Sequence, residues 1–128
     1  MKKTILVVED QRNHSLLLKY ALEDKGYDDI KTAADIETAL KMLQDKKNPP
    51  SLVCLDIMLP KSPDDPTIDE EGGFRIAKEI KGVPFIFTSV YERKEEIERG
   101  ISLGAKAFFV KPFDTEDVAV KTQEIIGK

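Results

Sequence analysis

Four apolar runs that each lead into polar or ionisable residues constrain the fold of this chain more than any other feature of its sequence. The clearest one extends from Leu52 to Leu55 and ends at Asp56. Such a run is typical of a strand that is buried on both faces. Charged side chains are rarely buried without a partner, so we expect Asp56 to reach water in a cleft or to meet a cation. Taken alone, Asp56 is equally compatible with a turn cap before Pro60.

The other three runs follow the same design. They are residues 4–10, which end in two acids, residues 85–89, which end in hydroxyls, and residues 107–113, which contain Lys111. In a parallel sheet all strands end at one edge, and ligands bind near that edge. A shared site is therefore the simplest explanation for polar groups that follow four separate strands.

Helical patterns separate these runs and predict a doubly wound α/β domain. Apolar residues recur three and four positions apart in the segments 13–25, 36–45, 72–81, 92–103 and 115–126. A short strand is expected at 28–33, so that five strands alternate with five helices. The 128 residues suffice for one domain, 1–128, and no repeat or linker indicates a second one.

Composition and charge exclude several classes of function. The net charge of −4, with no basic patch, argues against a nucleic-acid surface. The single cysteine, Cys54, lies in a buried run and cannot form an internal disulfide, which indicates a reducing compartment. No apolar segment approaches the ~20 residues of a membrane span, and none resembles a signal peptide. We therefore expect a soluble cytoplasmic protein with no membrane contact.

Acidic residues at two strand ends predict a metal-assisted phosphoryl site. If the strands before Glu9 and Asp56 are neighbours, their backbones lie about 4.8 Å apart. Glu9, Asp10 and Asp56 would then raise one another's pKa unless a cation lies among them, and Mg²⁺ prefers such ligands. A carboxylate neutralised in this way can attack phosphorus. Lys111 and the Thr88 hydroxyl would bind the phosphate, although either residue alone is also compatible with an inert strand end.

Four motifs together resemble the receiver domain of two-component response regulators. They are Val8-Glu9-Asp10, Leu55-Asp56-Ile57-Met58-Leu59-Pro60, Phe87-Thr88-Ser89 and Val110-Lys111-Pro112-Phe113, in order along the whole chain. The resemblance implies a flavodoxin-like five-stranded parallel sheet of order 2-1-3-4-5 with five helices. It also implies a stand-alone receiver similar to those of chemotaxis.

The resemblance assigns a phosphoacceptor and a metal site. It implies that Asp56 accepts the phosphoryl group. It further implies that Mg²⁺ is held by Asp10, by Asp56 and by the backbone carbonyl of Met58, with Glu9 acting through metal-bound water. These ligand roles are expectations that come from the family pattern.

The resemblance also implies a conformational switch. Lys111 and Thr88 would bind the phosphoryl group, and the Lys111–Pro112 peptide bond is expected to be cis. Thr88 would move towards the phosphate, and the aromatic side chain of Phe108 would follow it inwards. Plain core packing is the alternative for Phe108, which lacks the hydroxyl that a tyrosine would offer.

The chain departs from the family pattern after Pro60. Residues 61–71 form an apparent insertion of acids and prolines before Gly72. An acidic, solvated loop is the simplest interpretation, because long surface loops cost little closure entropy. The alternative is that the loop controls access for a partner kinase or phosphatase.

These features predict phosphorelay signal transduction. The expected donor is a histidine kinase or phosphotransfer protein, and the expected output is contact with a further protein, as no output module follows the last helix. The chain would catalyse only its own phosphorylation and dephosphorylation, as a monomer or a phosphorylation-dependent dimer, and would not otherwise be an enzyme. The main alternative is a receiver-like binding module that works without phosphorylation.

Two other classes and one other phosphorylation site fit less well. A flavodoxin-type cofactor carrier needs a phosphate-binding loop after the first strand, where Glu9 and Asp10 would repel phosphate. An aspartyl phosphatase usually needs a second acid two residues after the nucleophile, where Met58 stands. His14 invites a phosphohistidine interpretation, but an exposed helix-surface histidine is the simpler one.

Overall fold

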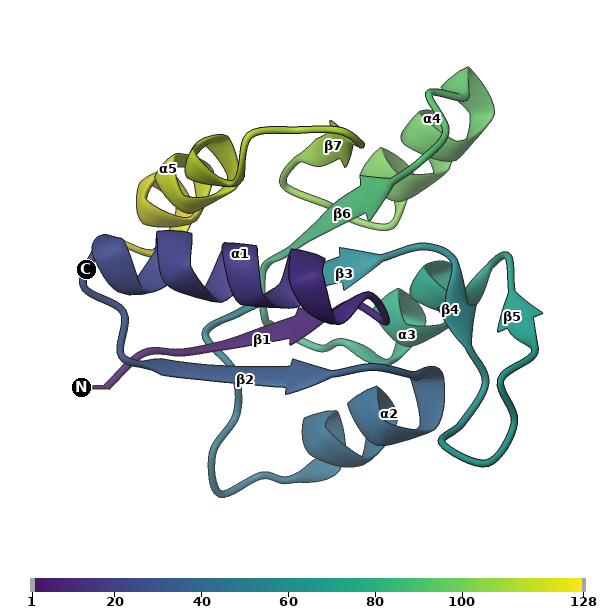
Figure 1. Cartoon of the computed structure of the whole chain (residues 1–128), viewed down its shortest axis with the longest axis horizontal. Helices are drawn as coiled ribbons and strands as arrows, with labels where there is room; N and C mark the ends of the chain where they lie inside the picture. Colours follow the sequence, from purple (N-terminus) through teal and green to yellow (C-terminus); the bar gives the residue numbers. More distant parts are fainter. Residues whose placement is uncertain (1, 128) are drawn as a thin grey trace.

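A five-stranded parallel sheet forms the centre of the structure, a computed structural model that describes residues 2–127 (Figure 1). The strands are β1 (Thr4–Val8), β2 (Asp29–Ala33), β3 (Leu52–Asp56), β6 (Phe85–Ser89) and β7 (Phe108–Val110). Their order across the sheet is β2-β1-β3-β6-β7. Numbered among themselves along the chain, these strands have the order 2-1-3-4-5, which confirms the predicted fold class.

Helices cover both faces of this sheet. On one face lie α1 (Arg12–Asp24) and α5 (Thr115–Ile126), and on the other lie α2 (Ile36–Gln44), α3 (Gly72–Glu79) and α4 (Lys94–Ser102) (Figure 1). Each helix lies within two residues of its predicted bounds, and the side chain of Asp35 caps α2 by accepting from the Thr38 amide at 2.7 Å. Within residues 2–127, no helix combines the length and apolarity needed to cross a membrane.

Both faces of β3 are buried, as its continuous apolar run predicted. Leu52 and Cys54 pack in the core cluster beneath α1 and α5, whereas Val53 and Leu55 pack in the cluster beneath α2 and α3. Full burial of one such side chain contributes about 1.5–3 kcal/mol. The apolar contacts on both sides therefore fix the position of Asp56 at the end of this strand.

The segment predicted as a loop after residue 60 contains an ordered antiparallel hairpin, so that prediction was wrong in part. The hairpin, residues 59–69, pairs β4 (Leu59–Pro60) with β5 (Ile68–Asp69). The Lys61 amide continues the pairing by donating to the Thr67 carbonyl at 3.0 Å. Strands of two residues carry no alternating pattern, so the composition rich in proline and acid indicated only a loop.

The hairpin is attached to the rest of the domain next to the site edge of the sheet. The carbonyl of Lys61 accepts from the amide of Glu37 at 3.1 Å, in the first turn of α2. That turn contains an amide with no partner inside the helix, so the bond satisfies it. Figure 1 shows β4 and β5 beyond the carboxyl ends of the strands, beside α2 and α3.

Candidate functional site

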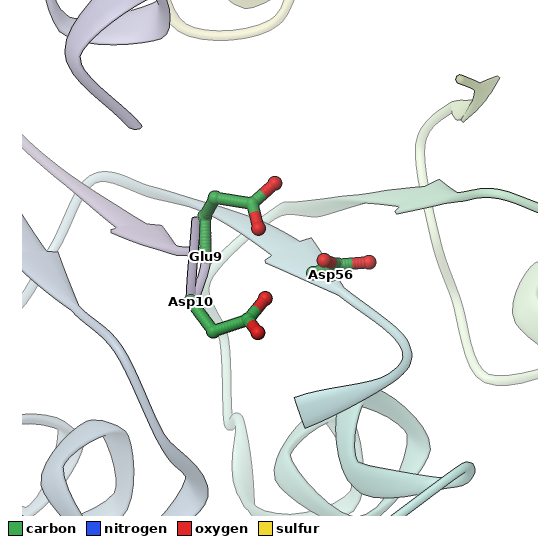
Figure 2. A group of neighbouring side chains, drawn as sticks. All are labelled: Glu9, Asp10 and Asp56. Carbon is green, nitrogen blue, oxygen red and sulfur yellow. The ribbon is translucent and has the colours of Figure 1, made fainter. Parts of the chain in front are cut away.

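Three carboxylates meet at the carboxyl edge of the sheet, as the strand ends predicted (Figure 2). Glu9 and Asp10 follow β1, and Asp56 ends β3, which is paired with β1. One ligand oxygen of each lies within 4.8 Å of the others. Glu9 and Asp56 are buried, with 4% and 5% of their surfaces exposed, whereas Asp10 is exposed to solvent.

Lys111 lies among these acids, so it is not a solvated lysine at an inert strand end, the alternative that the sequence left open. Its Nζ atom is 2.7 Å from Glu9 Oε1 and 3.0 Å from Asp56 Oδ2, and only 9% of its side chain is exposed. The Lys111 amide donates to the Ser89 carbonyl at 2.7 Å, which fixes the chain where β7 ends. The peptide bond between Lys111 and Pro112 is cis, as predicted.

The two buried carboxyl groups both contact Lys111, yet their pKa values are shifted in opposite directions. Burial and, to a lesser extent, the negative charge of Glu9 raise the pKa of Asp56 to about 7, although Lys111 opposes the rise. Burial acts in the same direction on Glu9, but hydrogen bonds from Lys111 and from the Gln11 amide hold the pKa of Glu9 below its usual value. Glu9 therefore keeps its charge beside Lys111, whereas Asp56 titrates near neutral pH.

The pKa values of Asp10 and Lys111, the other two charged groups of the pocket, are also shifted by their neighbours. The pKa of Asp10 is raised by partial burial and by the neighbouring Glu9 carboxylate. Burial opposes the charge on Lys111, yet its hydrogen bonds with Glu9 and Asp56 raise the pKa of its ammonium group. Three carboxyl groups thus face one lysine, and a second, hard cation would offset the remaining negative charge.

Thr88 lies next to Asp56 in the sheet. The register of β3 with β6 pairs these two residues, and the amide of Ile57 donates to the Thr88 carbonyl at 3.2 Å. Thr88 is buried, with 2% of its surface exposed, at the same end of the sheet as Asp56. This position is compatible with a hydroxyl that binds phosphate, and that role stays a prediction.

The chain turns directly after Asp56 and brings the backbone around its carboxylate. The Ile57 amide donates to Asp56 Oδ1 at 2.9 Å, and the next residue is the half-buried Met58. The Ile57 carbonyl accepts from Gly73 at 2.8 Å, at the start of α3. A Cβ atom on Gly73 would lie 2.4 Å from the Asp56 carbonyl oxygen, so only glycine permits this approach. The metal-ligand role of the Met58 carbonyl stays a prediction.

Phe108 lies on a different face of the sheet from Thr88. The register of β6 with β7 pairs Phe108 with Phe87 and pairs Thr88 with Phe109. The rings of Phe87 and Phe108 are 6.1 Å apart, and Phe108 is only half-buried. Its contacts are those of a residue at the edge of the core, and its role as a switch stays a prediction.

Two residues near the site were not assigned from the sequence. The backbone amide of Gln11 donates to Glu9 Oε2 at 3.1 Å, a contact that no side-chain pattern could indicate. The Nδ1 atom of His14 lies 3.6 Å from Glu9 Oε1, and 43% of the His14 side chain is exposed. His14 is thus partly exposed as expected, but it also borders the acidic pocket. The position of His14 in the first turn of α1, four residues after Asp10, was the feature of the sequence that could have indicated this contact.

Comparison with known proteins defines the class of this chain. The family model of the response regulator receiver domain matches residues 5–123. The alkaline phosphatase synthesis transcriptional regulatory protein PhoP of Bacillus subtilis (strain 168) is 36% identical, over 100% of this chain and 50% of that protein. The chain therefore belongs to the response regulator receiver domain family of two-component signalling. It spans about half the length of the curated relatives it matches.

Solved structures agree with this assignment. A CheY-like response regulator receiver domain protein from Methanospirillum hungatei JF-1 has a TM-score of 0.80 at 26% identity, over 98% of this chain and 94% of that one. A BeF3-activated DrrB receiver domain has a TM-score of 0.77 at 25% identity, over 100% of both chains. Receiver domains are phosphoacceptors rather than conventional enzymes, and their partners are histidine kinases. The acidic cluster of Glu9, Asp10 and Asp56 is consistent with the Mg²⁺ site of receivers.

Proposed function

We propose that this chain transmits a signal by accepting a phosphoryl group on Asp56 from a phosphohistidine of a histidine kinase or phosphotransfer protein. The observation that carries the proposal is the position of the Asp56 carboxylate, 3.0 Å from Lys111 Nζ and grouped with Glu9 and Asp10. This arrangement brings a nucleophile, a cation for the phosphate and a metal-ligating cluster to one sheet edge. The proposed location is the cytoplasm, where such kinases transfer phosphate.

The residues of the pocket suit Mg²⁺ held by Asp10, Asp56 and the Met58 carbonyl. Both Glu9 oxygens already accept hydrogen bonds, one from Lys111 and one from the Gln11 amide, so Glu9 acts through a metal-bound water. Mg²⁺ commonly takes one or two carboxylates and keeps several waters, which matches this division. When bound, the ion offsets the negative charge that Asp56 and the incoming phosphoryl group bring together.

The transfer is a displacement at phosphorus. An ionised Asp56 carboxylate oxygen attacks the phosphorus, and an O–P bond forms as the P–N bond of the phosphohistidine breaks. The electron pair of that bond leaves with the imidazole nitrogen, which takes up a proton. Lys111 then pairs with a phosphoryl oxygen, and the Thr88 hydroxyl donates to another one. Acetyl phosphate can serve as the donor in the same way, with acetate as the leaving group.

The added charge at Asp56 biases a two-state equilibrium. In the proposed switch Thr88 moves towards the phosphoryl group, and Phe108 changes its packing against Phe87. The outward surface near Phe108 then presents a different face to a downstream protein or to a second copy of this chain. The downstream partner is a protein rather than a nucleic acid in this proposal, given the net charge of −4.

The test is the intact mass of the protein after incubation with acetyl phosphate and Mg²⁺. We expect one added phosphoryl group in the wild type, and none in Asp56→Asn or in the presence of a magnesium chelator. A wild-type protein that stays unmodified under these conditions, and that binds no Mg²⁺, would contradict the proposal. It would favour a receiver-like module that binds proteins without phosphorylation.

A further inference from the structure

Helix α4 has little buried surface with which to hold its position. Gly100 is the buried residue among the nine of this helix. Figure 1 shows α4 projecting at the end of its layer, beside β6 and β7. A helix with few buried apolar contacts needs little free energy to open or shift locally. The polar contacts of α4 therefore have a large share in fixing its place.

Arg99 supplies such a contact to the segment that joins the hairpin to α3. Its Nη1 atom lies 3.0 Å from Oε2 of Glu71, and its Nη2 atom lies 3.4 Å from Oε1 of the same residue. Its guanidinium carbon also lies 4.2 Å above the centre of the Phe74 ring. Glu71 directly precedes α3, and the salt bridge of Asp69 with Arg75 at 2.6 Å ties β5 to that helix. Arg99 thus connects α4 to a segment that the hairpin holds in place.

The same part of α4 contacts the aromatic residues around Phe108. A Cβ atom on Gly100 would lie 3.0 Å from Phe87 Cδ2 and 3.4 Å from Phe108 Cδ2, so the backbone of α4 packs directly on both rings. The ring of Phe74, beneath Arg99, is 5.2 Å from that of Phe87. A change in the packing of Phe108 against Phe87 must therefore displace α4 or be resisted by it, because packed interiors tolerate few voids or overlaps.

We propose that Arg99 is a positioning residue that holds α4 in the placement of the unmodified receiver through its contacts with Glu71 and Phe74. This inference rests on the proposed function and adds a regulatory contact to it. In this structure Lys111 bonds directly to the Asp56 and Glu9 carboxylates, and the Arg99 contacts coexist with this arrangement. In the proposed modified state Lys111 bonds to a phosphoryl oxygen instead. In this proposal the alternative placement of α4 is the one that reacts with the donor. A contact that favours the present placement lowers the population of that reactive state and slows phosphorylation, and loss of the contact speeds it.

The test is a charge-reversal cycle on the two partners. We expect Arg99→Glu and Glu71→Arg each to raise the rate of phosphorylation by acetyl phosphate about two- to fivefold, the range for a partly exposed ion pair. The double variant, which restores an ion pair with reversed sign, should return the rate towards that of the wild type. Unchanged single variants, or a double variant at least as fast as either single one, would overturn the proposal.

Matched controls separate this contact from a general effect of charge on an anionic donor. Lys106→Glu and Glu79→Arg make the same charge changes as the two test variants. Both residues are exposed, and within residues 2–127 neither has a salt bridge. Both controls should react at the wild-type rate. Equal acceleration in a control and in its matched test variant would overturn the proposal.

A second measurement does not depend on phosphorylation. We expect the backbone amides of residues 97–102 to exchange hydrogen about two- to fivefold faster in Arg99→Glu than in the wild type. The double variant should reverse this change, and Lys106→Glu should not produce it. An unmodified wild type in acetyl phosphate would refute the proposed function alone, whereas unchanged exchange in Arg99→Glu would refute the role of Arg99.

Discussion

The Nζ atom of Lys111 lies 3.0 Å from Oδ2 of Asp56, although 55 residues separate the two in sequence. Strand β6 lies between β3, which ends at Asp56, and β7, which precedes Lys111. The lysine therefore reaches across the end of a strand to contact both buried acids, since it also bonds to Glu9. This geometry makes Lys111 the counter-charge of the pocket and gives the first prediction.

Replacing Lys111 with methionine should weaken both the fold and the phosphoryl transfer. The change leaves two buried carboxyl groups without their cation, so we expect the free energy of unfolding at pH 8 to fall by about 1–3 kcal/mol. Phosphorylation by acetyl phosphate should slow by at least about tenfold, because an interaction with the transferred group is lost. Urea unfolding and intact-mass kinetics measure the two effects. Lys111→Arg, which keeps the charge, should retain most of the stability; equal losses in both variants would contradict the electrostatic explanation.

Asp56→Asn should stabilise the metal-free protein at neutral and alkaline pH. The pKa of Asp56 is about 7 in the folded protein, above its value of about 3.9 in an unfolded chain. Between these values the folded state binds the additional proton, so ionisation of Asp56 lowers the stability as the pH rises through that range. At pH 8 in a magnesium chelator, we expect the variant to exceed the wild type by about 1–3 kcal/mol.

The pH dependence of this difference provides its control. Near pH 4 the Asp56 carboxyl group is protonated in the folded protein, so the advantage of the asparagine should largely disappear. Added Mg²⁺ should also reduce it at pH 8, because the ion stabilises the ionised wild-type site. Urea unfolding of both proteins at the two pH values measures it. A constant difference across the pH range would show that Asp56 does not titrate as the buried pocket requires.

The sequence predicted the convergence of the site because parallel topology leaves few alternatives. Once the runs before Glu9, Asp56 and Lys111 are strands of one parallel sheet, their ends must meet at one edge. Four motifs then identified the family. What could not be predicted depends on tertiary placement: the ion pair of Arg99 with Glu71 requires the docking position of α4, which no local pattern encodes. The hairpin was missed because its strands are too short to show periodicity.

Cys54 should be unreactive in the folded protein. Burial, together with the negative charges of Glu9 and Asp56, raises the pKa of its thiol to about 12. The thiolate is the reactive form of cysteine, and with this pKa almost no thiolate is present at pH 8. We expect labelling by a thiol reagent such as iodoacetamide to be at least about a thousandfold slower in the native protein than in urea. Rapid, complete labelling of the native protein, with retained circular dichroism, would contradict this burial.

The hairpin should affect transfer from a protein donor and spare transfer from a small one. Lys61 and Thr67 form the last pair before the turn, so residues 62–66 can be replaced by Asn-Gly, a two-residue turn that suits this geometry. The replacement keeps the bond from the Glu37 amide to the Lys61 carbonyl, and it removes Asp64 and Asp65 from the surface beside the site edge. With a phosphorylated histidine kinase or phosphotransfer protein that modifies the wild type, we expect the transfer rate to change at least about threefold, as for rim charges at an interface.

A length-preserving variant distinguishes charge from shape in this experiment. Asp64→Asn combined with Asp65→Asn keeps the length of the hairpin but removes the two negative charges at its turn. If repulsion or attraction of the donor protein is the cause, this variant should reproduce the effect of the shortened hairpin and lose it at high salt, since exposed charges are screened. If steric access is the cause, only shortening should change the rate. Acetyl phosphate bypasses protein docking, so an equal change with that donor would place the effect in the chemistry at Asp56 and refute a docking role.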